Sequence, residues 1–149
     1  MKIGIDIDNC ISNFDDVLLE EYLKHDKELR NTGIINENPE YLRIGMFDWT
    51  DEEEKCFYNE NIENFAKKLK PIEDASYYIK KLKEDGHEIY IITGRNNGEY
   101  TNPNKLTKQW LDKYDIVYDR LIFTNAYDKH AKTEVCLKNN IDLMIEDST

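Results

Sequence analysis

The sequence predicts an α/β fold in which helices cover a parallel β-sheet. Four short apolar runs, at residues 2–6, 88–92, 120–123 and 142–145, have strand character. Each run is continuous rather than alternating, which is typical of strands buried on both faces of a parallel sheet. Segments with helical spacing separate the runs, and such strand–helix–strand alternation predicts right-handed crossovers. The length of 149 residues, 40% of them apolar, suits one domain with room for a small insertion.

The segment 14–70 interrupts this alternation, because it contains no good strand. Apolar residues at helical spacing mark two helices in it. The second helix begins with the capping-box pattern of Thr50 and Glu53. We therefore predict a small helical insertion over the sheet, flanked by the two parts of the core, 1–13 and 71–149.

Three further helices are predicted between the later strands. The first has apolar residues at helical spacing from Ile72 onwards and stops at Gly86. The second begins with Asn102 as its cap and Pro103 in its first turn. The third contains Val135 and ends before the last strand.

Composition excludes several classes of function. There are 31 acidic and 20 basic residues, a net charge of −11, which disfavours binding to nucleic acid or to an anionic membrane. Carboxylates that hold a divalent cation would explain the charge, and so would solubility alone. The three cysteines, Cys10, Cys56 and Cys136, are odd in number and lack C-x-x-C spacing, which disfavours a disulfide framework or a zinc site.

The sequence shows no pattern typical of a targeting segment. The N-terminus has no apolar signal region, and no apolar stretch approaches the roughly 20 residues needed to span a bilayer. We expect a reduced, cytoplasmic protein, and the sequence leaves its oligomeric state open.

Candidate site residues follow the predicted strands, at the edge where open α/β sheets bind their ligands. Carboxylates follow the first and last strands, a threonine follows the second, and lysines lead into the helix after the third. The residues concerned are Asp6, Asp8, Thr93, Gly94, Arg95, Lys129, Lys132, Glu146 and Asp147. Converging carboxylates suit Mg²⁺, and a carboxylate neutralised by a metal can attack phosphorus. Hydroxyl, backbone N–H and lysine groups can offset phosphoryl charge.

This order of residues resembles the four motifs of the haloacid dehalogenase superfamily of phosphatases. Asp6 and Asp8 match the first motif, Thr93 the second, a helix-leading lysine the third, and Glu146 with Asp147 the fourth. The resemblance implies a Rossmann-like core with a parallel sheet and a small helical cap inserted after the first strand.

A narrower resemblance links residues 6–14, 128–132 and 141–148 to the 5′(3′)-deoxyribonucleotidases and their bacterial relatives. It spans essentially the whole chain, although position 9 is asparagine where those enzymes usually have glycine. That family normally continues with another strand and helix after the last motif. We therefore expect either a naturally short member or an incomplete one.

The resemblance implies a role for each matched residue. Asp6 would be the nucleophile and a metal ligand. Asp8 would be the general acid and then the base, with its backbone carbonyl on the metal. Asp147 would be the third protein ligand of Mg²⁺, with Glu146 as a water-mediated partner.

The same resemblance implies how the phosphoryl group is held. Thr93 would bind it with the adjacent Gly94, and a lysine would stabilise it. Lys132 is preferred for that role because it lies a turn inside the predicted helix, with Lys129 as the competing candidate.

The expected substrate is a small phosphorylated metabolite, most specifically a nucleoside monophosphate. Arg95 either reaches the substrate or lies on the surface. Aromatic residues of the insertion either stack on a nucleobase or pack in its core; they are Phe47, Trp49, Phe57 and Tyr58. A sugar phosphate is the alternative substrate. A phospho-accepting receiver is disfavoured, because the second and third strands lack a terminal aspartate.

Overall fold

The structure, a computed structural model, describes residues 1–37, 45–95, 100–125, 128 and 130–146. In this part of the chain a four-stranded sheet and five helices confirm the predicted α/β class. The strands are β1 (Lys2–Ile5), β2 (Glu88–Thr93), β3 (Arg120–Phe123) and β4 (Leu143–Ile145). The helices are α1 (Phe14–Leu29), α2 (Asp51–Lys68), α3 (Ala75–Glu84), α4 (Pro103–Lys113) and α5 (Ala131–Lys138).

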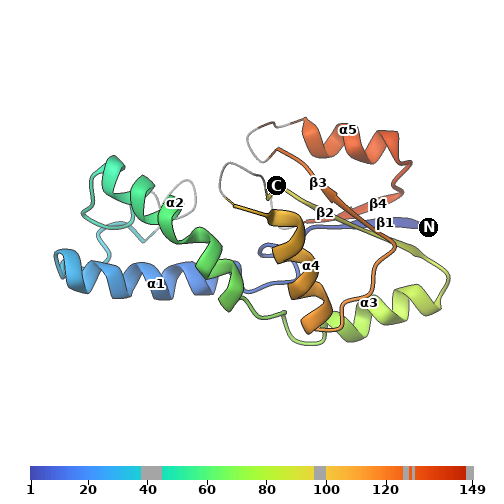
Figure 1. The fold of residues 1–149 in the computed structure, drawn as a ribbon, viewed down its shortest axis with the longest axis horizontal. Helices are drawn as coiled ribbons and strands as arrows, with labels where there is room; N and C mark the ends of the chain where they lie inside the picture. Colours follow the sequence, from blue (N-terminus) through green and yellow to red (C-terminus); the bar gives the residue numbers. More distant parts are fainter. Residues whose placement is uncertain (38–44, 96–99, 126–127, 129, 147–149) are drawn as a thin grey trace. The chain divides into compact units, whose positions relative to one another are not determined.

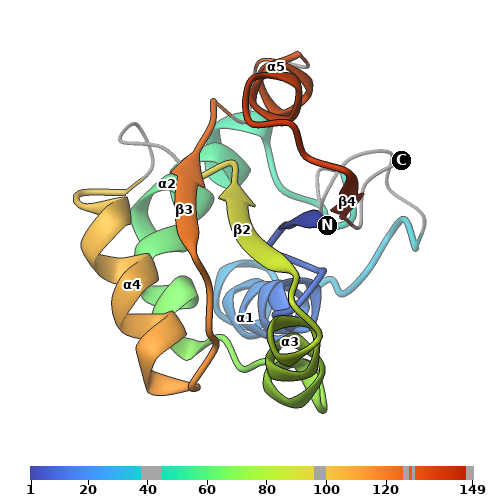
Figure 2. The ribbon, with the colours of Figure 1, turned by 90° about the vertical axis from the view of Figure 1, so that its right-hand side faces the viewer.

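The strands lie in the order β3-β2-β1-β4, and every pair is parallel (Figure 2). Gly4 in β1 pairs with Tyr90 of β2 on one side and Met144 of β4 on the other. A Cβ atom at position 4 would lie 2.6 Å from the Met144 sulfur, so a larger residue would require the Met144 side chain to shift. Helices α3 and α4 lie on one side of the sheet and α5 on the other (Figures 1 and 2).

The two central strands are buried, whereas the outer strands are not. Most residues of β1 and β2 are inaccessible to solvent, and none of those in β3 or β4 is fully buried. The prediction of four buried strands is therefore wrong for the outer pair. Both are edge strands of the sheet, and Leu143 and Ile145 of β4 are exposed.

The predicted helix signals are present, with one boundary displaced. Asn102 caps α4 by accepting a hydrogen bond from the Lys105 N–H at 3.1 Å. Gly86, with φ +92°, follows the last turn of α3. That helix begins at Ala75 rather than Ile72, because Asp74 has φ +64°, a left-handed conformation that a right-handed helix cannot include.

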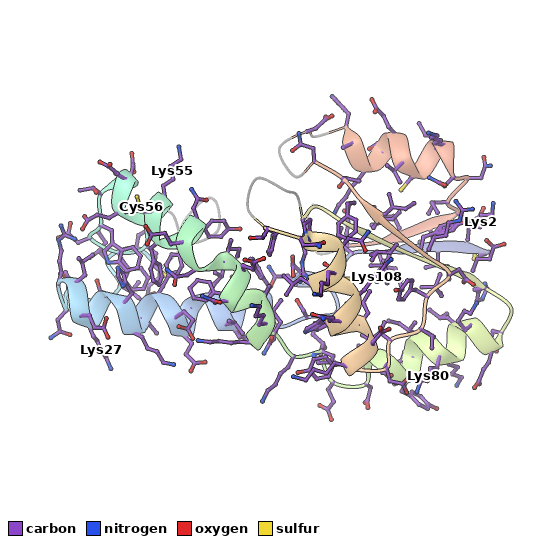
Figure 3. All side chains as sticks on the ribbon, viewed as in Figure 1. Lys2, Lys27, Lys55, Cys56, Lys80 and Lys108 are labelled. Atoms are coloured by element: carbon purple, nitrogen blue, oxygen red, sulfur yellow. The ribbon has the colours of Figure 1, made fainter. Side chains whose placement is uncertain are left out.

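The chain divides into two compact units, one of residues 1–13 with 70–149 and one of residues 14–69. The second unit consists of α1, α2 and their connection, and side chains fill the space between its two helices (Figure 3). Its α2 helix begins with the predicted capping box between Thr50 and Glu53. No helix in the described ranges is long and apolar enough to cross a membrane.

A buried carboxylate joins α1 to the connection that follows it. Asp26 accepts hydrogen bonds from the Trp49 indole N–H at 3.0 Å and from the Gly33 backbone N–H at 2.7 Å. Gly33 has φ +80°, a left-handed conformation that favours glycine. The carboxylate thus satisfies a buried indole donor that the interior would otherwise leave unpaired, and it also holds the half-buried Gly33 amide.

Candidate functional site

Asp6 directly follows β1, and hydrogen bonds hold both its backbone and its carboxylate. Its N–H donates to the Ile145 carbonyl at 2.9 Å, which extends the pairing of β1 with β4 by one bond. The Ile7 N–H donates to Asp6 Oδ1 at 2.8 Å. These bonds fix the carboxylate at the carboxyl end of the sheet, where ligands of open α/β folds bind.

The turn after Asp6 is built around the Ile7 carbonyl. This oxygen accepts N–H groups from Cys10, Ile11 and Ser12 at 3.1, 2.9 and 3.0 Å. Asn9 lies in the turn with φ +61°, a left-handed conformation that asparagine tolerates better than most residues. Asparagine can therefore occupy the position where the resembled nucleotidases usually have glycine.

Lys132 brings positive charge to two carboxylates. Its Nζ lies 2.9 Å from Asp6 Oδ2 and 3.5 Å from Glu146 Oε2. Burial, the largest effect, raises the pKa of the Asp6 carboxyl, the contact with Lys132 lowers it, and the nearby charge of Asp8 raises it again. The net result is a pKa above the usual range for aspartate. The structure thus brings Asp6, Lys132 and Glu146 together.

Asp8 forms an ion pair with Arg95, which follows β2. Arg95 Nη2 lies 3.0 Å from Asp8 Oδ1, and Nε lies 3.4 Å from Oδ2. Arg95 is only 2% exposed, so the expectation that it lies on the surface is wrong. Its Nη1 donates to the Thr107 hydroxyl of α4 at 3.1 Å. Nothing in the sequence pattern indicated Thr107.

Thr93 ends β2, which is the strand next to β1. Its hydroxyl is fully buried and has no hydrogen-bond partner among the described residues. The Thr93 carbonyl accepts the Thr124 N–H at 2.8 Å, and Gly94 after it is half-buried. An orphaned buried hydroxyl is uncommon in native proteins and fits an oxygen-rich ligand.

Oxygen atoms dominate the possible metal donors. The Asp6 and Glu146 carboxylates both contact the Lys132 ammonium, so their oxygens lie on the same side of the site. This donor set fits Mg²⁺. Asp147, predicted as the third protein ligand, and Lys129 lie outside the described residues. Within the residues that are described, no group of three or more His, Cys, Asp or Glu residues could hold a metal ion.

The two aromatic residues predicted to contact substrate, Phe47 and Trp49, lie in the core of the helical unit. They are 2% and 8% exposed, and their rings stack with centroids 5.1 Å apart. Tyr22 stacks on Trp49 at 5.2 Å, and the Trp49 indole N–H is bonded to Asp26. These contacts support the packing interpretation over contact with a nucleobase.

Neither protein-family models nor curated proteins match this sequence. Solved structures do match. A haloacid dehalogenase-like hydrolase from Streptococcus pneumoniae has a TM-score of 0.64 at 11% identity, over 99% of this chain and 76% of that one. A protein from Thermotoga maritima named as a beta-phosphoglucomutase has a TM-score of 0.59 at 16% identity, over 99% and 77%.

A chain of the Pnkp1/Rnl/Hen1 RNA repair complex is also similar, with a TM-score of 0.55 at 18% identity. The match covers 99% of this chain and 36% of that much longer one. At these identities the comparisons concern architecture. The α/β core with its helical insertion has the fold of the haloacid dehalogenase hydrolases.

Proposed function

We propose that this protein is a phosphatase that hydrolyses small phosphate monoesters, with Asp6 as its nucleophile. The observation that carries the proposal is the contact of the Asp6 carboxylate with Lys132 at the carboxyl end of the sheet. A carboxylate attacks phosphorus more readily when positive charge offsets the repulsion between the two anions. The hydrolase fold also supports it, as does the Thr93 hydroxyl, which has no hydrogen-bond partner in the described part of the chain.

The proposed reaction has two steps. In the first, an Asp6 oxygen forms a bond to phosphorus while the ester bond breaks, and Asp8 gives a proton to the leaving oxygen. In the second, Asp8 takes a proton from water, which attacks the phosphorylated Asp6 and releases inorganic phosphate. In both steps Lys132 offsets the negative charge of the phosphoryl oxygens, and the Thr93 hydroxyl binds them.

A divalent cation completes the proposed site. Asp6, the Asp8 backbone carbonyl and Asp147 would hold Mg²⁺, with Glu146 acting through water. When bound, the ion neutralises charge on the nucleophile and the phosphoryl group.

The substrate we propose is a nucleoside monophosphate, and the support for it is the resemblance of residues 6–14, 128–132 and 141–148 to nucleotidases. The negative charge of the helical unit supports a small phosphate ester as substrate over a nucleic-acid polymer. Residues 14–69 contain 15 acidic and 7 basic residues, and this excess repels a polyanion. A sugar phosphate is the second candidate, because a structure of similar fold is named as a beta-phosphoglucomutase.

A phosphate-release screen with Mg²⁺ tests both the proposed nucleophile and the proposed substrate. It should compare ribonucleoside monophosphates, deoxyribonucleoside monophosphates and sugar phosphates, using wild type and Asp6→Asn. Asp6→Asn should reduce release to background, while Asp85→Asn, a carboxylate after α3, is the matched control. Full turnover by Asp6→Asn would overturn the nucleophile. A tenfold higher kcat/KM for a sugar phosphate, about 1.4 kcal/mol, would favour the second candidate.

A further inference from the structure

We propose that Arg95 is a positioning residue for Asp8, holding this carboxylate in the orientation that proton transfer to the leaving oxygen requires. The inference rests on the proposed function, in which Asp8 is the general acid. It assigns Arg95 a task different from substrate binding.

The first support is the geometry of the ion pair. Two nitrogens of one planar guanidinium face the two oxygens of the Asp8 carboxylate, at 3.0 and 3.4 Å. Paired contacts of this kind fix the plane of a carboxylate as well as its location. The Ser12 hydroxyl adds a weaker contact to Asp8 Oδ1 at 3.4 Å.

The second support is the way the guanidinium itself is held. Its third nitrogen, Nη1, donates to the Thr107 hydroxyl of α4, which is completely buried. The charge lies 5.8 Å from the centre of the Tyr100 ring, another buried group. Contacts on three sides restrict the Arg95 side chain to one conformation. The ion pair with Arg95 in turn restricts the orientation of the Asp8 carboxylate.

The third support is the difference in exposure between the two partners. The Arg95 side chain is 2% exposed, and the Asp8 side chain is 24% exposed. A ligand arriving from solvent therefore meets the carboxylate and not the guanidinium. An arginine that binds phosphate presents its N–H groups to the ligand, whereas all three nitrogens of Arg95 face Asp8 and Thr107.

This arrangement predicts a particular kinetic defect. A general acid must lie within about 2.6–3.2 Å of the oxygen that it protonates, and an unrestrained carboxylate spends less time there. Loss of Arg95 should lower kcat most for esters whose leaving group needs the proton. Binding of the phosphoryl group, reported by KM, should change little.

The kinetic test compares Arg95→Met and Arg95→Lys on p-nitrophenyl phosphate and on glycerol 2-phosphate, an alkyl ester with a poor leaving group. Arg95→Met should lose at least about tenfold more kcat on the alkyl ester. Arg95→Lys should fall between it and wild type, because one ammonium cannot face both oxygens. Arg30→Met, which removes an arginine–carboxylate pair from the helical unit, is the control and should behave as wild type.

A double-mutant comparison separates positioning from the alternatives. Asp8→Asn with Arg95→Met should be no slower than Asp8→Asn alone, since Arg95 acts through Asp8. Additive losses, equal losses of kcat/KM on both esters, or a raised KM with unchanged kcat would each overturn the proposal. The last result would make Arg95 a substrate-binding residue.

An NMR measurement tests the Arg95–Asp8 ion pair independently of enzymatic activity. The Arg95 Nε–H resonance, identified by its loss in Arg95→Lys, should shift in Asp8→Asn and not in Asp142→Asn. An unmoved resonance overturns the role of Arg95 alone. A wild-type protein that releases phosphate from no ester overturns the proposed function together with that role, so the two failures are distinguishable.

Discussion

Lys132 Nζ lies 2.9 Å from Asp6 Oδ2, which joins the start of α5 to the end of β1. The ammonium also reaches Glu146, so one cation serves two carboxylates from opposite ends of the chain. Burial favours the neutral form of Asp6, and Lys132 opposes that effect. Lys132 therefore favours the charged form of the proposed nucleophile in a place where burial disfavours charge.

Lys132→Met should lower kcat for phosphate release by about 10²–10³-fold, the usual effect of removing one group that stabilises developing negative charge. Steady-state kinetics with p-nitrophenyl phosphate measures it. Lys138→Met, at the exposed end of the same helix, is the matched control. Equal activities of the two variants would show that Lys132 does not act on the phosphoryl group.

Asp6→Asn should raise the melting temperature of metal-free protein at neutral pH. Because the folded-state pKa of Asp6 is raised, the folded state binds this proton more tightly than the unfolded chain. Ionisation of Asp6 therefore destabilises the fold as pH rises from the unfolded pKa to the folded one. The variant lacks this penalty, so its advantage should shrink as pH falls below the folded pKa.

Thermal melts of wild type and Asp6→Asn in EDTA, taken between pH 4 and 8, measure this difference. Glu88→Gln, at the exposed start of β2, serves as a control for removing a negative charge. An advantage for Asp6→Asn that grows towards low pH would contradict the sign of the shift.

Removal of metal should abolish phosphate release, and Mg²⁺ should restore it. Bound ion should also stabilise the fold by about 2.7 kcal/mol at a concentration one hundred times its Kd. Melts with and without Mg²⁺ measure the gain, which should be much smaller in Asp6→Asn. Activity that persists in EDTA, with no melting shift, would show that catalysis needs no divalent ion.

Asp26→Ala should destabilise the helical unit by about 1–3 kcal/mol, since a buried donor and a half-buried donor lose their acceptor at once. These donors are the Trp49 indole and the Gly33 backbone N–H. Urea unfolding followed by tryptophan fluorescence measures the loss. Asp48→Ala, an exposed neighbour of Trp49, should change stability by less than about 0.5 kcal/mol.

Features of the fold set by local sequence were predictable. The apolar runs located all four strands, and Thr50 with Glu53 located the start of α2. Two properties of the fold were not predictable. The exposure of β4 follows from its place at the edge of the sheet, and the late start of α3 follows from the left-handed backbone of Asp74.

The candidate site was predictable to the same degree. Topology alone brings the ends of adjacent parallel strands to one edge, which is why Asp6 and Thr93 could be selected from sequence. Side-chain partners depend on rotamers and on helix placement, which the sequence pattern does not contain. The contact of Arg95 with Asp8 and Thr107 is of this kind. The catalytic roles themselves stay predictions.

The Ile7 carbonyl with its three donors has a consequence for how the protein loses its activity. Its acceptance of the Cys10, Ile11 and Ser12 amides holds the turn after Asp6, whereas the Asp6 N–H is bonded to Ile145 of the exposed edge strand β4. An amide bonded to an edge strand exchanges with solvent deuterium when that strand opens locally, at a free energy below that of global unfolding. We expect the Asp6 amide to exchange faster than the amides of the buried strand β2. Heat should then inactivate the protein by separating β4 from β1 before the whole sheet opens.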